Sequence, residues 1–155
     1  RLCIIALFDY LIYNLIEDGR GILNILDYFK SVHAQRQINK LARKYKNKKI
    51  VIYGAGEYFQ ILKNNFDLSK LNIVGIADKK FETSKASNPT PYLALAPEEL
   101  KNFDLDVILV ALYDDTSLCD YLEYQLLINT QNEDKPIRSI IEPTFLYTIK
   151  VLLGK

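Results

Sequence analysis

The sequence has few of the side chains on which metal chemistry depends. Its 155 residues include a single histidine, His33, and two cysteines, Cys3 and Cys119, which stand far apart. A structural zinc site needs several nitrogen or sulfur ligands at short, regular spacings, and this sequence cannot supply such a set. We therefore expect no metal site, and we expect a reduced, cytoplasmic protein with two buried thiols.

Strong net charge and long apolar runs are also missing. The 20 basic and 19 acidic residues leave a net charge of +1, which argues against a nucleic-acid partner. The most apolar stretch, residues 2–16, contains Asp9 and Asn14 and is shorter than the roughly 20 residues of a membrane span. We expect it to form a buried or interface helix that contacts a second copy or a neighbouring domain. Membrane-surface contact and a truncated span are the alternatives.

The overall composition is that of one globular domain. Hydrophobic residues make up 49% of the chain and charged residues 25%, which excludes wholesale disorder. A chain of 155 residues holds one proper core rather than two. Because the sequence starts with Arg1 and contains no methionine, we interpret it as a piece of a longer protein.

The first 46 residues have helical periodicity and predict an N-terminal helical extension. Apolar residues recur at helical spacing from Ile22 to Phe29 and again from Ile38 to Tyr45. Between residues 36 and 49 there are seven basic residues and no acidic one. This run predicts either a solvated helix face with a charged linker or a patch that contacts phosphate or lipid.

Residues 47–155 alternate between strand and helix patterns. Apolar, β-branched runs at 49–53, 72–77, 92–95, 106–112 and 137–142 predict five strands, and the tail at 145–155 predicts a last helix. Pro97 is placed as the first residue of a helix, and Leu118, Leu122 and Leu126 recur at the spacing of another. This alternation predicts a Rossmann-like α/β domain, an open parallel sheet flanked by helices.

A glycine turn follows the first of these strands. Gly54, Ala55 and Gly56 allow a sharp turn and bring backbone N–H groups close to a bound group. The positive end of the next helix favours phosphate as that group. Two neighbours depart from the usual pattern, since Glu57 could repel a pyrophosphate and Phe59 replaces a third glycine. The alternative is a purely structural turn with an empty or vestigial site.

Further candidate residues fall at the same edge of the predicted sheet. Asp78 ends the second strand, 22 residues after Gly56, where a carboxylate receives ribose hydroxyls. Lys79 and Lys80 could meet a 2′-phosphate, although solvated loop lysines are the alternative. The loop from Leu112 through Tyr113 to Asp115 could form the wall of the site, or its aspartates could cap a helix. Tyr58 joins this set because it lies in the first turn of the helix after the glycines.

The segments KKIVIYGAGEY, LNIVGIADKK and YLALAPEELKNFDLDVILVAL carry a resemblance. They resemble the small Rossmann-type nucleotide-binding domains of bacterial nucleotide-sugar and surface-polysaccharide biosynthesis enzymes, in which IYGAGE, PEEL and DVIIVA motifs recur. The resemblance covers roughly residues 46–145. It implies a nucleotide, NAD, NADP or a nucleotide sugar bound at Gly54, Gly56 and Asp78.

The sequence does not identify a catalytic residue. Tyr45 and Lys49 have the Tyr-x-x-x-Lys spacing of short-chain dehydrogenases, but they precede the first strand and should lie away from the ligand edge. His33 has no evident triad partner. Whether the protein is an enzyme stays open, and we expect a binding or regulatory module. The rival interpretations are a methyltransferase-like domain for S-adenosylmethionine and a non-catalytic oligomerisation module.

Overall fold

A five-stranded, all-parallel sheet forms the centre of the molecule. The computed structural model describes residues 25–84, 88, 90–113 and 115–144. The strands are β1 (Ile50–Tyr53), β2 (Ile73–Ala77), β3 (Leu93–Leu95), β4 (Val107–Val110) and β5 (Ile137–Ser139). Their order in the sheet is β3-β2-β1-β4-β5, with every neighbouring pair parallel. The predicted α/β fold with an open parallel sheet is therefore confirmed, and the order is that of doubly wound sheets.

The central strands are apolar throughout because both of their faces are covered. All four residues of β1 and of β4 are buried. Alternate side chains enter two different hydrophobic clusters: Ile50 and Ile52 face one, whereas Val51 and Tyr53 face the other. A two-sided core of this kind explains why the sequence shows continuous apolar runs here instead of an apolar–polar alternation.

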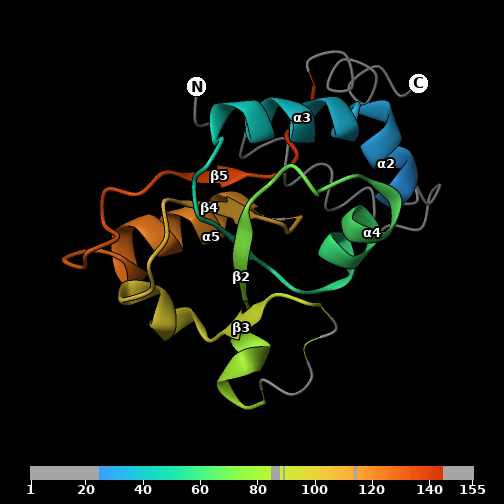
Figure 1. Cartoon of the computed structure of the whole chain (residues 1–155). Helices are drawn as coiled ribbons and strands as arrows, with labels where there is room; N and C mark the ends of the chain where they lie inside the picture. The colour runs from blue at the N-terminus through green and yellow to red at the C-terminus, as the bar shows by residue number, and fades with distance from the viewer. Residues whose placement is uncertain (1–24, 85–87, 89, 114, 145–155) are drawn as a thin grey trace.

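Helices cover the two faces unequally. The helices are α2 (Ile25–Ser31), α3 (Ala34–Lys44), α4 (Glu57–Asn65) and α5 (Asp115–Tyr121), with a π-helix at Leu122–Leu126 and 3₁₀ helices at Lys79–Glu82 and Pro97–Lys101. Helices α2, α3 and α4 contribute to the cluster that contains Ile50, and the π-helix and the second 3₁₀ helix contribute to the cluster that contains Val51. Figure 1 shows α3 beside β5 and α2 beside α4.

Two glutamine side chains fasten α3 to distant parts of the chain. Gln35 accepts a hydrogen bond from the Asp67 N–H (2.8 Å) and donates one to the Asp67 carbonyl (3.1 Å). Gln37 does the same with Glu142, at 2.9 and 2.8 Å. Each glutamine amide thus bonds both the N–H and the carbonyl of one backbone residue, which is the pattern of a hydrogen-bonded residue pair in a β-sheet. Helix α3 is held on both flanks.

Several elements differ from the sequence-based expectation in kind. The helix expected at Pro97 is a 3₁₀ helix of five residues, and the Glu99 carboxylate accepts from the Ala96 N–H at its start (2.7 Å). The helix that carries Leu122 widens into a π-helix after Tyr121. Cys119 is a free thiol as expected, but it is half-buried instead of buried. The helices expected at 2–16 and 145–155, together with Cys3, lie outside the described residues. The domain boundary at residue 46 stays a prediction.

Candidate functional site

The candidate site lies at the carboxyl ends of β1, β2 and β4. After β1 the chain passes into α4 on one face of the sheet, and after β4 it passes into α5 (Figure 1). Backbone pairing continues one residue past these strands, through Gly54 N–H to the Ala77 carbonyl and Ala111 N–H to the Tyr53 carbonyl, both at 2.8 Å. These two bonds join the ends of β1, β2 and β4 where the strand order reverses, which is the position where ligands bind in open α/β sheets.

Gly54 is required by the turn itself. Its φ of +109° lies in a region that side chains with a Cβ rarely adopt, and an added Cβ would stand 2.7 Å from the Ala111 carbonyl oxygen. The same Cβ would meet the Leu112 side chain at 3.0 Å. The first glycine thus lets the turn after β1 pack directly against the loop after β4.

Gly56 has the opposite environment. It is the N-cap of α4, with extended dihedral angles (φ −78°, ψ −165°) that any residue adopts. A Cβ added to it would meet nothing within 4 Å. The absence of a side chain at this position is therefore not required by packing, and it leaves open space beside the first turn of α4. The N–H groups of a helix's first turn have no partner within the helix.

Asp78 joins the glycine turn to the end of β2. Its half-buried carboxylate accepts from the Ala55 N–H (2.7 Å) with one oxygen and from the Lys80 N–H (3.0 Å) with the other. Lys80 returns to the same turn, because its ammonium group donates to the Ala55 carbonyl at 2.9 Å. One N–H group of the turn is thus satisfied within the protein. Each carboxylate oxygen keeps a second lone pair with which to accept from a ligand hydroxyl.

Two tyrosines form the wall between α4 and the loop after β4. The rings of Tyr58 and Tyr113 meet edge to face with centroids 5.1 Å apart. Burial, together with the nearby carboxylate of Glu57, raises the pKa of Tyr113 to about 12. Glu57 itself is exposed, and its charge acts on the Tyr113 hydroxyl at the rim of the turn.

The predicted candidates therefore fall into a group that lies together and one residue that lies apart. Gly54, Ala55, Asp78 and Leu112 are linked by the contacts above, and Glu57 and Tyr58 join them through Tyr113. The Lys79 side chain instead reaches the face of Tyr121, with its ammonium group 5.6 Å from the ring centroid. Phe59, at the place of a third glycine, is completely buried in the core. The role of these residues in binding stays a prediction.

Sequence reasoning did not single out Tyr53, the last residue of β1. Its side chain is 3% exposed, and its hydroxyl has no hydrogen-bond partner among the residues that the structure describes. Burial raises the pKa of Tyr53, and the proximity of Tyr121, Asp78 and Glu82 raises it further. The sequence does not reveal this buried hydroxyl, because a tyrosine in an apolar strand is ordinary. The free-energy cost of burying its hydroxyl depends on whether a hydrogen-bond partner lies nearby in the folded chain.

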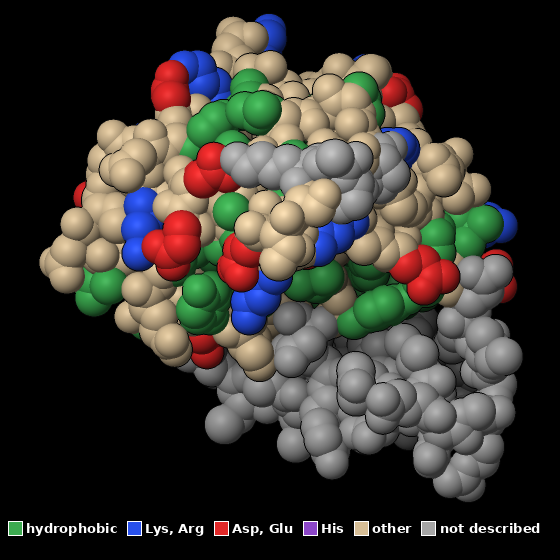
Figure 2. Space-filling view, turned by 90° about the horizontal axis from the view of Figure 1, so that it is seen from below, with side chains coloured by type: hydrophobic (Ala, Val, Ile, Leu, Met, Phe, Trp, Pro, Cys, Tyr) green, Lys and Arg blue, Asp and Glu red, His purple; other side chains and the backbone are tan. Residues whose placement is uncertain are grey.

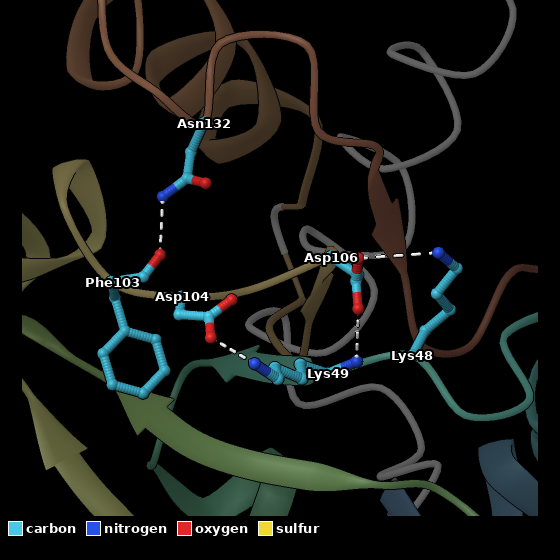
Figure 3. A network of polar contacts seen from close by, with 6 residues as sticks. All are labelled: Lys48, Lys49, Phe103, Asp104, Asp106 and Asn132. Atoms are coloured by element: carbon cyan, nitrogen blue, oxygen red, sulfur yellow. Dashed lines mark hydrogen bonds and ion pairs between the residues drawn. The ribbon is translucent and has the colours of Figure 1, made fainter.

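The Tyr-x-x-x-Lys spacing has no catalytic counterpart in the structure. Tyr45 is buried in the core. Lys49 lies at the amino ends of the strands, where its ammonium group pairs with Asp104 and its backbone N–H donates to Asp106 at 2.8 Å (Figure 3). Lys48 pairs with Asp106 beside it, at 3.6 Å. The interpretation of this spacing as coincidental agrees with the observed positions.

Two general features of the described residues bear on the class of site. In the described ranges, no three His, Cys, Asp or Glu side chains come together in a way that could hold a metal ion. Within the same ranges, none of the helices has the length and apolar character needed to cross a lipid bilayer.

The fold and this edge define a doubly wound α/β domain with a glycine turn at its topological switch point. The chain belongs to the C2185-like, N-terminal family, whose model matches residues 46–139, more than half of the chain. That range contains all five strands and the candidate residues at the carboxyl edge of the sheet. No curated protein and no solved structure matches the chain.

Proposed function

We propose that the carboxyl edge of the sheet binds a nucleotide-type ligand, with NAD, NADP or a nucleotide sugar as the first candidates. The observation that carries this proposal is the pair of glycines in different environments. Gly54 is fixed by packing, whereas Gly56 leaves unfilled space at the positive end of α4. Space of this kind beside helix N–H groups suits a phosphate.

Asp78 is the residue that we expect to bind the ribose of the ligand. Its carboxylate is held between the Ala55 and Lys80 N–H groups, so it is fixed in position and keeps acceptor lone pairs for a ligand. A carboxylate at the end of the second strand is suited to the two hydroxyls of a ribose. Phosphate at the turn and ribose at Asp78 together describe a nucleoside phosphate.

The surroundings of the edge favour binding over catalysis. Tyr113 is one of the tyrosines beside the turn, and burial raises its pKa, which makes it a weaker proton donor at neutral pH than an exposed tyrosine. We therefore propose a binding or regulatory module, of the kind that could serve a glycan or nucleotide-sugar biosynthesis protein. We also propose a cytoplasmic location, because the sequence contains only two cysteines, which is typical of a reduced protein.

Calorimetric titration tests the proposal. NAD, NADP, a uridine diphosphate sugar and S-adenosylmethionine are titrated separately into the intact chain. We expect at least one of the first three to bind, and Gly56→Val to weaken that binding by more than about tenfold, since its side chain occupies the phosphate space.

The controls separate a lost site from a lost fold. Because a Cβ at Gly56 meets nothing within 4 Å, the Gly56→Val protein should keep its melting temperature to within a few degrees. Binding of S-adenosylmethionine alone would favour the methyltransferase-like alternative. If the folded protein shows no heat of binding with any of the four ligands, the proposal is overturned. The alternative of a non-catalytic interaction module would then remain.

A further inference from the structure

A groove lies along α3, where this helix runs beside β5 (Figure 1). Its volume is about 730 Å³, and its walls come from α3, from the turn before α3, and from residues 138–144. These walls are more than 90 residues apart in sequence and meet only in the folded chain. The lining residues include none of the glycine turn or Asp78, so the groove is separate from the proposed nucleotide edge.

The groove concentrates positive charge. Its lining contains five basic side chains and one carboxylate; these are Arg36, Lys40, Arg43, Lys44 and Arg138, with Glu142. All five basic side chains are exposed. Four of them recur along one side of α3 at the i, i+4, i+7 and i+8 spacing, and Arg138 adds a guanidinium from β5. The chain as a whole carries a net charge of only +1, so this concentration is local.

Four described lysines outside the groove, Lys30, Lys48, Lys49 and Lys101, form ion pairs with acidic residues. Lys48 and Lys49, at the end of the same basic run, are paired with Asp106 and Asp104 (Figure 3). On the face shown in Figure 2, positive and negative side chains alternate and hydrophobic ones form small separate groups. The five groove cations, in contrast, form no ion pair with another residue in the described part of the chain.

The walls of the groove are held in place before any ligand arrives. Gln37 bonds both the N–H and the carbonyl of Glu142, and it also donates to the Val32 carbonyl at 3.0 Å. His33, which also lines the groove, begins α3 in the left-handed conformation (φ 56°). A residue other than glycine in that conformation is uncommon and is often found at functional sites.

We propose that this groove binds a ligand with two or more clustered phosphate groups, either a free polyphosphorylated metabolite or the headgroup of a phosphorylated lipid. Guanidinium groups bind phosphate oxygens in pairs, and the lysines add mobile charge. The lining contains no Phe, Tyr or Trp on which a nucleic-acid base could stack. A concave site also suits a compact anion better than a flat surface does.

The test compares two double variants that remove the same charge. Arg43→Gln/Arg138→Gln takes one cation from each wall, and Lys46→Gln/Lys70→Gln takes two exposed cations from outside the groove. Binding of inositol hexakisphosphate and tripolyphosphate is measured by calorimetry. Vesicles of phosphatidylcholine with phosphatidylinositol bisphosphate, or with phosphatidylserine at equal charge, are compared by flotation.

We expect the groove variant to bind at least about tenfold more weakly, the loss that one charged hydrogen bond can account for, and the control to change less than about threefold. Arg43→Lys/Arg138→Lys should recover part of the affinity, since it keeps charge but not paired donors. Binding to the free probes identifies a metabolite, and binding confined to phosphoinositide vesicles identifies a lipid headgroup.

Three results would overturn the proposal. The first is equal weakening by the two double variants, which would show a general response to charge. The second is equal binding to phosphatidylinositol bisphosphate vesicles and phosphatidylserine vesicles, which would show that the protein responds to negative charge in general. The third is no binding to any probe at low salt by a protein that still unfolds cooperatively.

Discussion

At the scale of single residues, the two glycines of the turn have different structural roles. Gly54 is imposed by a positive φ and by the Ala111 carbonyl, whereas Gly56 borders unfilled space. Sequence reasoning located the turn because glycine after a buried strand is a strong local signal. It could not assign these roles, since each depends on what the chain after β4 brings to the same edge.

Tyr53 allows a prediction about a hydroxyl that has no partner among the described residues. Tyr53→Phe removes a buried polar atom whose desolvation is uncompensated, so the free energy of unfolding at pH 7 should stay equal or rise by about 1 kcal/mol. Urea unfolding measures this. Tyr124→Phe is the matched control, because Tyr124 is 63% exposed.

The same variant should change how stability depends on pH. The pKa of Tyr53 is higher in the folded chain than in the unfolded one, where it is about 10. Its contribution is therefore fully present below about pH 10 and is lost as the pH rises above that value. The Tyr53→Phe protein should lose stability less steeply than the wild type between about pH 10 and 11.5. Identical slopes would contradict the assignment of the raised pKa.

At the scale of elements, α3 is positioned by side chains that act as strand partners. Gln35 and Gln37 each pair with both the N–H and the carbonyl of one residue, on opposite flanks of the helix. Sequence periodicity placed this helix, because Ile38 and Ala42 mark its buried side. It gave no sign of the pairing, since a glutamine on a polar face is ordinary and its partner lies 105 residues away for Gln37.

Removing the side-chain amide of Gln37 should lower the free energy of unfolding. Gln37→Ala deletes two bonds to Glu142 and one to Val32, and we expect a loss of about 1–2 kcal/mol in the free energy of unfolding, because each bond contributes about 0.5–1.5 kcal/mol before solvent exposure reduces it. Gln131→Ala, at an exposed position, is the control. Urea titration followed by circular dichroism provides the measurement. A change no larger than that of the control would show that water replaces the amide without cost.

At the scale of the whole molecule, the helices before residue 46 belong to the main core. Phe29, Val32 and Ile38 are completely buried in the cluster that also contains Ile50, Ile52, Val107 and Leu109 from the sheet. The matched family range begins at residue 46 and so leaves out one cover of the sheet.

A chain that starts at residue 46 should therefore fail to fold as the complete chain does. Its sheet would expose the side chains of Ile50, Ile52 and Val107 that α2 and α3 cover, and we expect loss of near-ultraviolet circular dichroism and of cooperative unfolding. In the complete chain, Ile38→Asp should have a similar effect and Asn39→Asp should not. An unchanged unfolding midpoint in the shortened chain would contradict this account.

Most of the sheet could be predicted from sequence because its signal is local and strong. The runs around Ile50, Ile73, Val107 and Ile137 are apolar and bounded by turn residues, and the alternation with helices leaves few topologies. The candidate edge followed from that topology. What could not be predicted depends on three-dimensional neighbours, such as the reach of Lys80 to Ala55 instead of a ligand, or the meeting of α3 and Arg138 in one groove.

The pairing of Gln37 with Glu142 has a consequence for synthesis on the ribosome. The apolar side of α3 is synthesised before β4 and residues 140–141, which share its hydrophobic cluster, and Glu142 follows 105 residues after Gln37. At about 5–20 residues per second, that delay is on the order of 5–20 seconds. During this interval the nascent chain carries an amphipathic helix whose packing partners are incomplete, so a chaperone that shields emerging apolar segments would find this helix among its substrates.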